Sequence, residues 1–351
     1  MEAEPRDLLS DLPDDILLHI FSFLQVKDIL CLRILSTRFN KTLCTATPSF
    51  CFSDHYLHPH NCSCTHIFDF MFNTVPKNRP HALIINRVSF SCFCNKPEHR
   101  NLHKQWIIQL FKLKPSMFYE LSLDYDLPSI FTSLPKFQSL KVLKLNMNQL
   151  HSVNMLPQMK LAALETLHIK SIYSLNGLLG EWISQSFPFL KHLFLQKIII
   201  WAVKPDFTIR SSSLVDLVIH DLRSPIPVRI MAQNLRTLSC FIRERVHEYN
   251  TKFVLESCVP NLQSLTWVGR RVGVDLETLK NLQVTTNPRF LITRESKWDV
   301  LIQLFQAIRS ARQLHIDTDV LRQWMRRTIM GILEESVSLK NLSHLQIDVV
   351  G

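Results

Sequence analysis

The chain has 351 residues and a mass of 41.0 kDa, and its 46% hydrophobic and 20% charged residues are typical of a globular protein with a substantial core. Its six glycines are too few and too dispersed for the glycine-rich phosphate loops of nucleotide-binding folds. The net charge of +10 comes without long basic runs or regular alternation of basic and aromatic residues, so we expect no nucleic-acid partner.

The positive charge is unevenly distributed. Residues 1–50 hold five basic and seven acidic side chains, so the remaining residues carry a charge of +12, which favours an acidic or phosphorylated partner. The nine cysteines are odd in number, in a chain long enough to fold without disulfides. The N-terminus is acidic, and the longest apolar run, 198–203, is far too short to span a membrane. We therefore expect a reduced protein of the cytoplasm, the nucleus or both, without a membrane partner.

Residues 11–43 predict three short helices. Leu12-Pro13-Asp14-Asp15 opens the first, because proline and carboxylates both suit the first turn of a helix. Apolar residues then recur at helical spacing, and Asp28 and Ser36 are candidate caps for the second and third helices. About forty residues cannot bury enough apolar surface to fold alone, so this unit should pack on the rest of the chain or on another protein.

The order of these segments resembles the F-box motif. LPDDIL at 12–17, Lys27-Asp28 and LSTRF at 35–39 resemble its opening, middle and close, with Leu35 and Phe39 in place of the usual Val and Trp. The resemblance implies docking to the Skp-type adaptor of a cullin-RING ubiquitin ligase. The alternative is an ordinary helical cap on the segment that follows. The adaptor-binding residues that the F-box resemblance implies are Leu12, Pro13, Ile16, Leu17, Ile20, Leu24, Leu35 and Phe39.

A leucine repeat occupies most of the remaining chain. Residues 140–150 match L-x-x-L-x-L-x-x-N-x-L at every fixed position, and weaker copies recur about every 24 residues, inside the window of leucine-rich repeats. Each copy predicts a short strand with inward leucines, and stacked copies predict a curved parallel sheet over a continuous core. The copies begin at Phe118, Leu140, Leu164, Leu190, Leu214, Leu235, Leu262, Leu279, Ala311 and Leu342.

The C-terminal copies are separated by longer intervals. Apolar stripes at 300–308 and 320–333 predict two helices on the convex side of the solenoid. The apolar residues of 342–350 predict a last strand followed only by Gly351. We therefore expect an array that is incomplete at its C-terminal edge, where an unpaired strand favours association.

The chain as a whole resembles plant-type F-box/leucine-rich-repeat proteins. Segments 68–70, 84–90, 106–108 and 120–123 resemble the entry region of that class. The expected fold is α/β: a small all-helical F-box at 1–50, a connecting and entry region at 51–115, and an irregular leucine-rich-repeat solenoid at 116–351.

Two groups of cysteines and histidines could supply nitrogen and sulfur ligands to zinc. Their cysteine pairs leave only one residue between them, whereas structural zinc sites usually leave two to four, so we predict no metal and no other cofactor. No local nucleophile motif such as G-x-S-x-G occurs, and we expect no catalytic residue. The two groups are Cys51, His55, His58, His60, Cys62, Cys64 and His66, and Cys92, Cys94, His99 and His103.

Residues that flank the strand leucines should face outward on the concave side of the solenoid. Basic and imidazole groups outnumber acids there, which favours an acidic or phosphorylated target segment. The alternative is a solvated face of mixed polarity. The predicted target-binding residues are Lys144, Asn146, His168, Lys170, His192, Phe194 and His220.

These features together predict the substrate-recognition subunit of an SCF-type ubiquitin ligase. Its F-box would bind the Skp-type adaptor, and through it a cullin, while its repeats hold a target protein. The alternative is a leucine-rich-repeat scaffold that binds protein without assembling a ligase.

Overall fold

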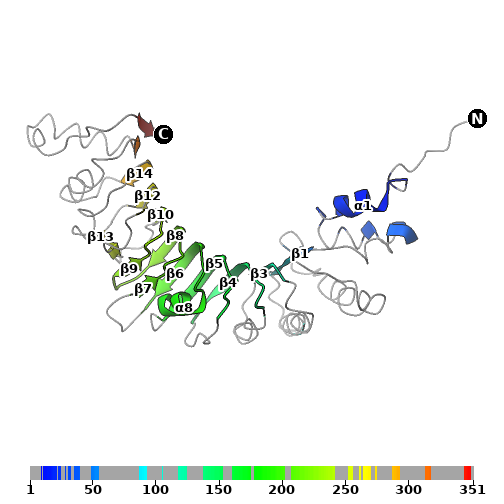
Figure 1. The fold of residues 1–351 in the computed structure, drawn as a ribbon, viewed down its shortest axis with the longest axis horizontal. Coiled ribbons are helices and arrows are strands. Elements are labelled where there is room, and N and C mark those ends of the chain that lie inside the picture. Colours follow the sequence, from blue (N-terminus) through cyan, green and yellow to red (C-terminus); the bar gives the residue numbers. More distant parts are fainter. Residues whose placement is uncertain are drawn as a thin grey trace, which may run out of the picture. The chain divides into compact units, whose positions relative to one another are not determined.

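The computed structural model describes residues 9, 11–21, 23–24, 28, 31–32, 35–39, 49–54, 87–92, 105, 118–124, 137–152, 160–174, 178–201, 207–241, 252–255, 261, 264–269, 273–274, 287–292, 313–317 and 344–348. The chain divides into two compact units, Met1–Lys144 and Leu145–Gly351. Figure 1 shows the helices and strands with the labels used below.

The N-terminal unit opens with helix α1, Asp14–Phe21, which carries Asp14 and Asp15 in its first turn. Favourable interaction of these carboxylates with the helix dipole explains why the helix begins there. Residues 28, 31–32, 35 and 37–39 are also helical. The Ser36 hydroxyl accepts a hydrogen bond of 3.2 Å from the Arg38 amide, which confirms that Ser36 caps the third helical segment.

Three parallel strands follow in the same unit: β1, Ser49–Asp54; β2, Arg87–Cys92; and β3, Glu120–Asp124. Ser49 lies opposite Arg87, and Arg87 lies opposite Glu120. Much of β1 and all of β2 fall in the segment predicted to connect the F-box to the repeats. Val88, Leu121 and Leu123 are buried, so the strands of this unit already share the inward apolar positions of the later repeats.

These strands belong to a 12-stranded sheet, called the long sheet below, whose strands follow one another in chain order. Strand β4, Val142–Ser152, contains the boundary between the two units. Every strand pair from β5 to β16 is parallel. This arrangement confirms the predicted parallel-sheet solenoid (Figure 1). Its further strands are β5, Thr166–Ser174; β6, His192–Ile200; β8, Asp216–Arg223; β10, Thr237–Phe241; β12, Ser264–Gly269; β14, Asn287–Ile292; β15, Gln313–Asp317; and β16, His344–Asp348.

A second, four-stranded parallel sheet was not predicted. It has the order β13-β11-β9-β7, with β7, Phe207–Arg210; β9, Val228–Met231; β11, Lys252–Leu255; and β13, Gly273–Val274. Helix α8, Leu179–Ser186, packs beside β7 and is joined to it by the Ser184 hydroxyl, which accepts the Arg210 amide at 2.9 Å.

The repeat start predicted at Leu279 lies outside the described residues, which resume with β14 at Asn287. The starts predicted at Ala311 and Leu342 agree with β15 and β16. The predicted helices at 300–308 and 320–333 lie outside the described residues.

Tight turns lead into the strands of the long sheet. The amides of Leu140, Leu164, Leu190 and Leu235 each donate to the carbonyl three residues earlier, at 3.1–3.2 Å. The first residues of each strand then donate to the preceding repeat; for example, the amides of Lys191 and His192 both donate to the Glu165 carbonyl. These bonds fix the register, so equivalent positions of successive strands lie side by side.

Strands β5, β6 and β8 each contain one left-handed residue, at which the strand bends. Ser171, Lys197 and Asp221 have φ values of 60°, 52° and 52°. The inward positions resume immediately after the bend, at Ile172, Ile198 and Leu222, all of which are buried. A shared left-handed residue therefore lets each strand turn without interrupting the stacked apolar core.

Candidate functional site

Apolar side chains are exposed on the helical part of the N-terminal unit. Ile16 is 44% exposed, Leu35 is 72% exposed and Phe23 is 76% exposed, and Pro13 is also exposed. Phe23 makes an edge contact with the ring of His19, with a centroid distance of 5.1 Å. Exposed apolar groups of this size favour association with a partner.

The same helical segments have a small core of their own, made of Leu17, Phe21 and Phe39. Leu17 is fully buried, Phe39 is 2% exposed, and the rings of Phe21 and Phe39 meet edge to face. The predicted adaptor-binding residues therefore divide in two. Pro13, Ile16 and Leu35 are exposed, whereas Leu17 and Phe39 support the surface from inside. Leu12, Ile20 and Leu24 are partly buried against that core.

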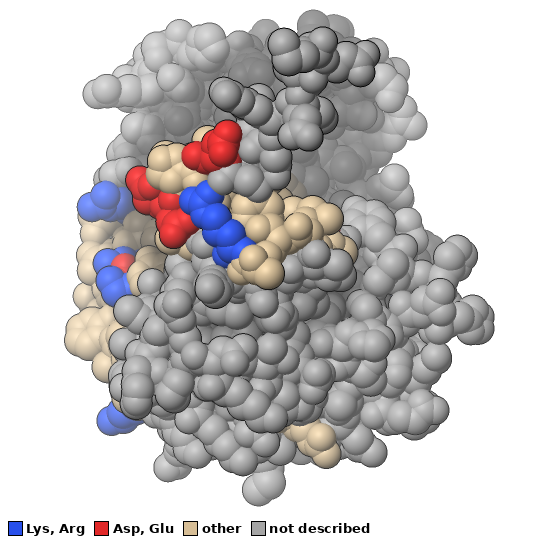
Figure 2. Space-filling model, turned by 90° about the vertical axis from the view of Figure 1, so that its right-hand side faces the viewer, with Lys and Arg blue, Asp and Glu red and all other residues tan. Residues whose placement is uncertain are grey.

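Arg38 ties the last of these helical segments to the first. Its guanidinium donates to Asp14 Oδ1 through Nε at 3.1 Å and Nη2 at 2.7 Å, and Nη2 also donates to the Leu12 carbonyl at 2.6 Å. The sequence prediction assigned no role to this residue, although it lies in the motif segment 35–39. Figure 2 looks onto this unit and shows basic, acidic and uncharged side chains lying side by side.

The predicted basic stripe on the repeats is partly neutralised. Glu120, whose side chain is 11% exposed, lies between two cations, with Arg87 Nε and Lys144 Nζ each 2.7 Å from one of its oxygens. Lys144 was predicted to bind target, but it already pairs with Glu120, which it shares with Arg87. This pairing could be anticipated only by placing residues of successive repeats in register.

A second polar row crosses β6, β8 and β10. His192 Nδ1 lies 2.6 Å from Asp216 Oδ2, and the Thr237 hydroxyl donates to Asp216 Oδ1. Lys191 Nζ, beside the start of β6, pairs with Glu165 at 2.9 Å. His192 was also predicted to bind target, so two of the seven predicted residues contact an acidic side chain of a neighbouring repeat.

Two imidazole–phenyl stacks lie on the same sheet. His168 stacks on Phe194 with a centroid distance of 4.0 Å, and His220 stacks on Phe241 at 4.6 Å. Both pairs are register partners on neighbouring strands. The sequence prediction brought His168, Phe194 and His220 together correctly on one face but missed Phe241. Asn146 Oδ1 is buried without a hydrogen-bond partner among the described residues.

No metal or membrane-spanning feature occurs in the described part of the chain. Its His, Cys, Asp and Glu side chains form no group suited to a metal ion, and none of its helices is long and apolar enough to cross a bilayer. Of the predicted cysteine and histidine groups, only the backbones of Cys51, in β1, and Cys92, in β2, are described. The other members lie outside the described residues, so the zinc prediction stays open.

Comparison with protein families finds one match. Residues 9–46 match the F-box domain, and this match supports the interpretation of the chain as an F-box protein. A comparison with curated proteins finds no match. F-box domains generally bind Skp-type adaptors, and the proteins that carry them are generally non-catalytic substrate adaptors of SCF-type ubiquitin ligases. The match includes α1, the buried core around Leu17 and the exposed side chains of Ile16, Phe23 and Leu35.

Proposed function

We propose that this protein recruits a target to an SCF-type cullin-RING ubiquitin ligase. The helical segment binds a Skp-type adaptor, which connects it to a cullin, and the repeats hold the target protein. The protein contributes no catalytic residue. It accelerates ubiquitin transfer by raising the effective concentration of the target near the charged ubiquitin carrier. The cytoplasm and the nucleus are the compartments that this function requires.

The observation that carries the adaptor role is the coincidence of the F-box match with exposed apolar groups. The core of the helical segments already buries Leu17 and Phe39, whereas the side chains of Ile16, Phe23 and Leu35 remain exposed to solvent. Burying an exposed Leu or Ile side chain contributes about 1.5–3 kcal/mol, so two or three such groups at the centre of an interface can decide whether it forms.

We propose the long sheet as the target-binding surface. Its outward positions carry side chains of several chemistries in fixed register, so a bound segment can be read across neighbouring strands. The proposed contacts include Lys144, Asn146, His168, Lys170, His192, Phe194 and His220. Lys144 and His192 already have acidic partners, so they should orient neighbouring groups more than they attract charge.

A different function would use the same sheet without a ligase. In that alternative the protein is a repeat scaffold and the exposed groups of the helical segment bind no adaptor. The F-box match favours the ligase role, because a scaffold has no need of that domain at residues 9–46.

The test is capture of a purified Skp-type adaptor by the full-length protein and by the double variant Ile16→Asp, Leu35→Asp. Both side chains are exposed, so the variant should fold, and it should lose at least about a hundredfold in affinity because two apolar contacts are replaced by charges. Leu17→Asp is unsuitable, since a charge in the buried core would disrupt the segment itself.

Phe189→Asp is the matched control, because Phe189 is 60% exposed but lies in the turn before β6. It should capture the adaptor as well as the unmodified protein does. Circular dichroism checks that all variants are folded. Failure of the unmodified, folded protein to capture the adaptor would reject the ligase role and favour the scaffold. Undiminished capture by the folded double variant would show that Ile16 and Leu35 do not form the interface.

A further inference from the structure

Three cations that have no acidic partner among the described residues lie toward the ends of β5, β6 and β8. At the beginning of these strands, Lys191 pairs with Glu165 and His192 pairs with Asp216. Toward their ends, no acidic side chain of the described residues pairs with Lys170, Lys197 or Arg223. In β5, β6 and β8, ion pairs therefore lie near the strand beginnings, whereas cations without an acidic partner among the described residues lie near the strand ends.

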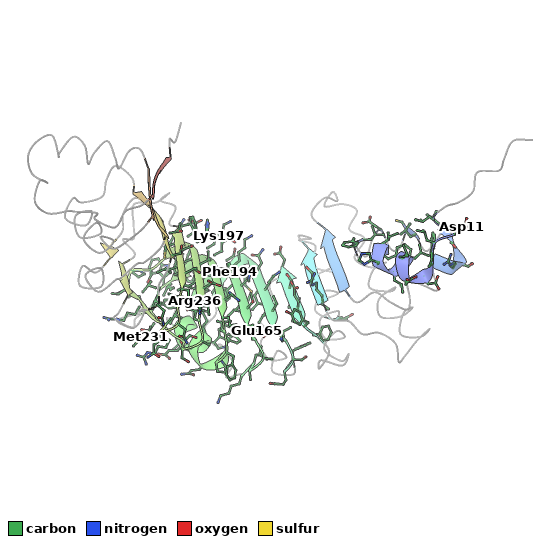
Figure 3. The ribbon with its side chains drawn as sticks, turned by 45° about the horizontal axis from the view of Figure 1, so that its top comes forward. Asp11, Glu165, Phe194, Lys197, Met231 and Arg236 are labelled. Carbon is green, nitrogen blue, oxygen red and sulfur yellow. The ribbon has the colours of Figure 1, made fainter. Side chains whose placement is uncertain are left out.

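The register places these three cations on neighbouring strands. Lys170 of β5 lies opposite Gln196 of β6, the residue before Lys197, and Arg223 of β8 lies opposite Ile199 of β6. Figure 3 shows Lys197 beyond Phe194 along the strands, with Glu165 and Arg236 toward the opposite strand ends. Lys197 is left-handed (φ 52°) and lies at the bend of β6, where its side chain is exposed to solvent.

Apolar groups lie among the cations. Tyr173 lies opposite Ile199, and both are partly exposed. Trp201 is 43% exposed, its amide donates to the Ser174 carbonyl at 2.8 Å, and its ring lies 6.5 Å from that of Tyr173. We call this set the strand-end patch; it consists of Lys170, Tyr173, Lys197, Ile199, Trp201 and Arg223.

We infer that the strand-end patch binds an acidic polypeptide segment that carries an apolar side chain beside its anionic groups. This inference rests on the proposed function, in which the repeats hold the target. Unpaired Lys and Arg provide complementary charge, and the planar guanidinium of Arg223 can hold a carboxylate or a phosphoryl group through two hydrogen bonds. Trp, Tyr and Arg are also the residue types that dominate protein interfaces energetically.

The predicted site differs from the concave stripe expected from sequence. Among the stripe residues only Lys170 belongs to the patch, and Lys144 and His192 already contact the carboxylates of Glu120 and Asp216. One acidic residue, Asp221, occupies the bend position of β8 that Lys197 occupies in β6, so the cations still outnumber the acids.

The test is fluorescence anisotropy of the full-length protein with labelled peptides. One probe has glutamates around a single phenylalanine, a second has phosphoserines in place of the glutamates, and a third has glutamates around a serine. We expect an anionic phenylalanine peptide to bind, with affinity that falls as salt is raised because exposed charges are screened. The serine peptide should bind about tenfold more weakly than the glutamate peptide that contains phenylalanine. If the phosphoserine peptide binds more tightly than that glutamate peptide, the preferred anionic group is a phosphoryl group.

Two pairs of variants separate the patch from general charge. Lys197→Asp with Arg223→Glu should weaken the anionic phenylalanine peptides at least about tenfold, as expected for lost hydrogen bonds between charged groups. Arg210→Glu reverses an exposed charge on β7 and should change affinity less than about twofold. Likewise Trp201→Ala should weaken binding and Phe189→Ala should not.

The inference would be overturned if neither anionic phenylalanine peptide bound. It would also be overturned if the serine peptide bound equally well, or if the Lys197 and Arg223 double variant bound as tightly as the unmodified protein. Adaptor capture is measured on the same preparations. Peptide binding without adaptor capture would reject the ligase role while leaving the patch in place. Adaptor capture without peptide binding would do the opposite.

Discussion

Cys240 takes the place of an aliphatic residue in the core of the long sheet. It lies opposite Ile219 and is fully buried. Burial raises the pKa of its thiol well above the ordinary value, because the thiolate would be desolvated. Stability from this group is fully present below the ordinary thiol pKa and is lost as pH rises above about 9, where the unfolded thiol ionises first.

We therefore predict that Cys240 is unreactive in the folded protein. At pH 8, iodoacetamide should modify the exposed Cys31 and leave Cys240 unmodified until denaturant is added, because only an accessible thiolate reacts. Mass spectrometry of tryptic peptides locates the label. Labelling of both cysteines at similar rates without denaturant would contradict the buried position.

Lys197 has a left-handed backbone conformation, which residues other than glycine rarely adopt. A left-handed residue costs about 1–2 kcal/mol unless it is glycine, and β-branched residues are the least suited to it. Lys197→Gly should therefore preserve or raise the free energy of unfolding, whereas Lys197→Val should lower it by about 1 kcal/mol or more. Urea unfolding measures both, and a Val variant as stable as the Gly variant would show that the bend is absent.

The contrast between Ile16 and Leu17 shows what the sequence could predict at this scale. Both lie in the apolar stripe, so pattern alone placed them on one surface. The structure exposes Ile16 and buries Leu17 completely, because the helical segment containing Phe39 covers one side of α1. Periodicity identifies an apolar face, but only the packing partner determines which of its residues remain exposed.

Among the elements, helix α8 depends on one glycine. A Cβ atom on Gly180 would lie 2.3 Å from the Thr208 carbonyl oxygen of β7, much closer than atoms tolerate. Gly180→Ala should therefore separate the helix from the strand and cost about 1–3 kcal/mol, as overpacking does. Gln185→Ala, at an exposed position of α8, is the control for urea unfolding. Equal stability of the two variants would contradict this contact.

Arg38 should set the stability of the F-box core. Its bonds to Asp14 and the Leu12 carbonyl require a planar group with several donors, so Arg38→Lys should restore only part of what Arg38→Ala loses. Hydrogen exchange of the α1 amides in the full-length protein should be faster in the Ala variant. Unchanged exchange would mean that the core around Leu17 holds the segments together without this residue.

The strands of the long sheet from β3 to β12 could be predicted because each carries a leucine of the predicted repeat. The second sheet could not, because its strands are only two to four residues long. Alternations such as Val228 and Ile230 are too short to distinguish from chance.

We propose that the whole molecule carries two binding surfaces that differ in chemistry. The F-box surface is apolar, with Ile16, Phe23 and Leu35 exposed. The strand-end patch combines Trp201 and Tyr173 with cations that have no acidic partner in the described part of the chain. An apolar interface depends weakly on salt and a charged one depends on it strongly, so salt should release the target before it releases the adaptor.

That difference could be anticipated from the sequence only in part. The acidic N-terminal segment and the basic remainder were evident from composition. Which cations remain available for a target was not, because Lys144 and Glu120, or His192 and Asp216, become partners only when consecutive repeats stack. Stacked repeats turn distant residues into neighbours, and this determines the charge of the surface.

The central claim is that the F-box of this protein binds a Skp-type adaptor. Light scattering coupled to size-exclusion chromatography measures it most directly, with the purified full-length protein mixed with the purified adaptor. We predict one complex whose mass equals one copy of each chain, and two separate species for the variant Ile16→Asp, Leu35→Asp. Separate elution of the unmodified, folded protein and the adaptor at micromolar concentration would contradict the account.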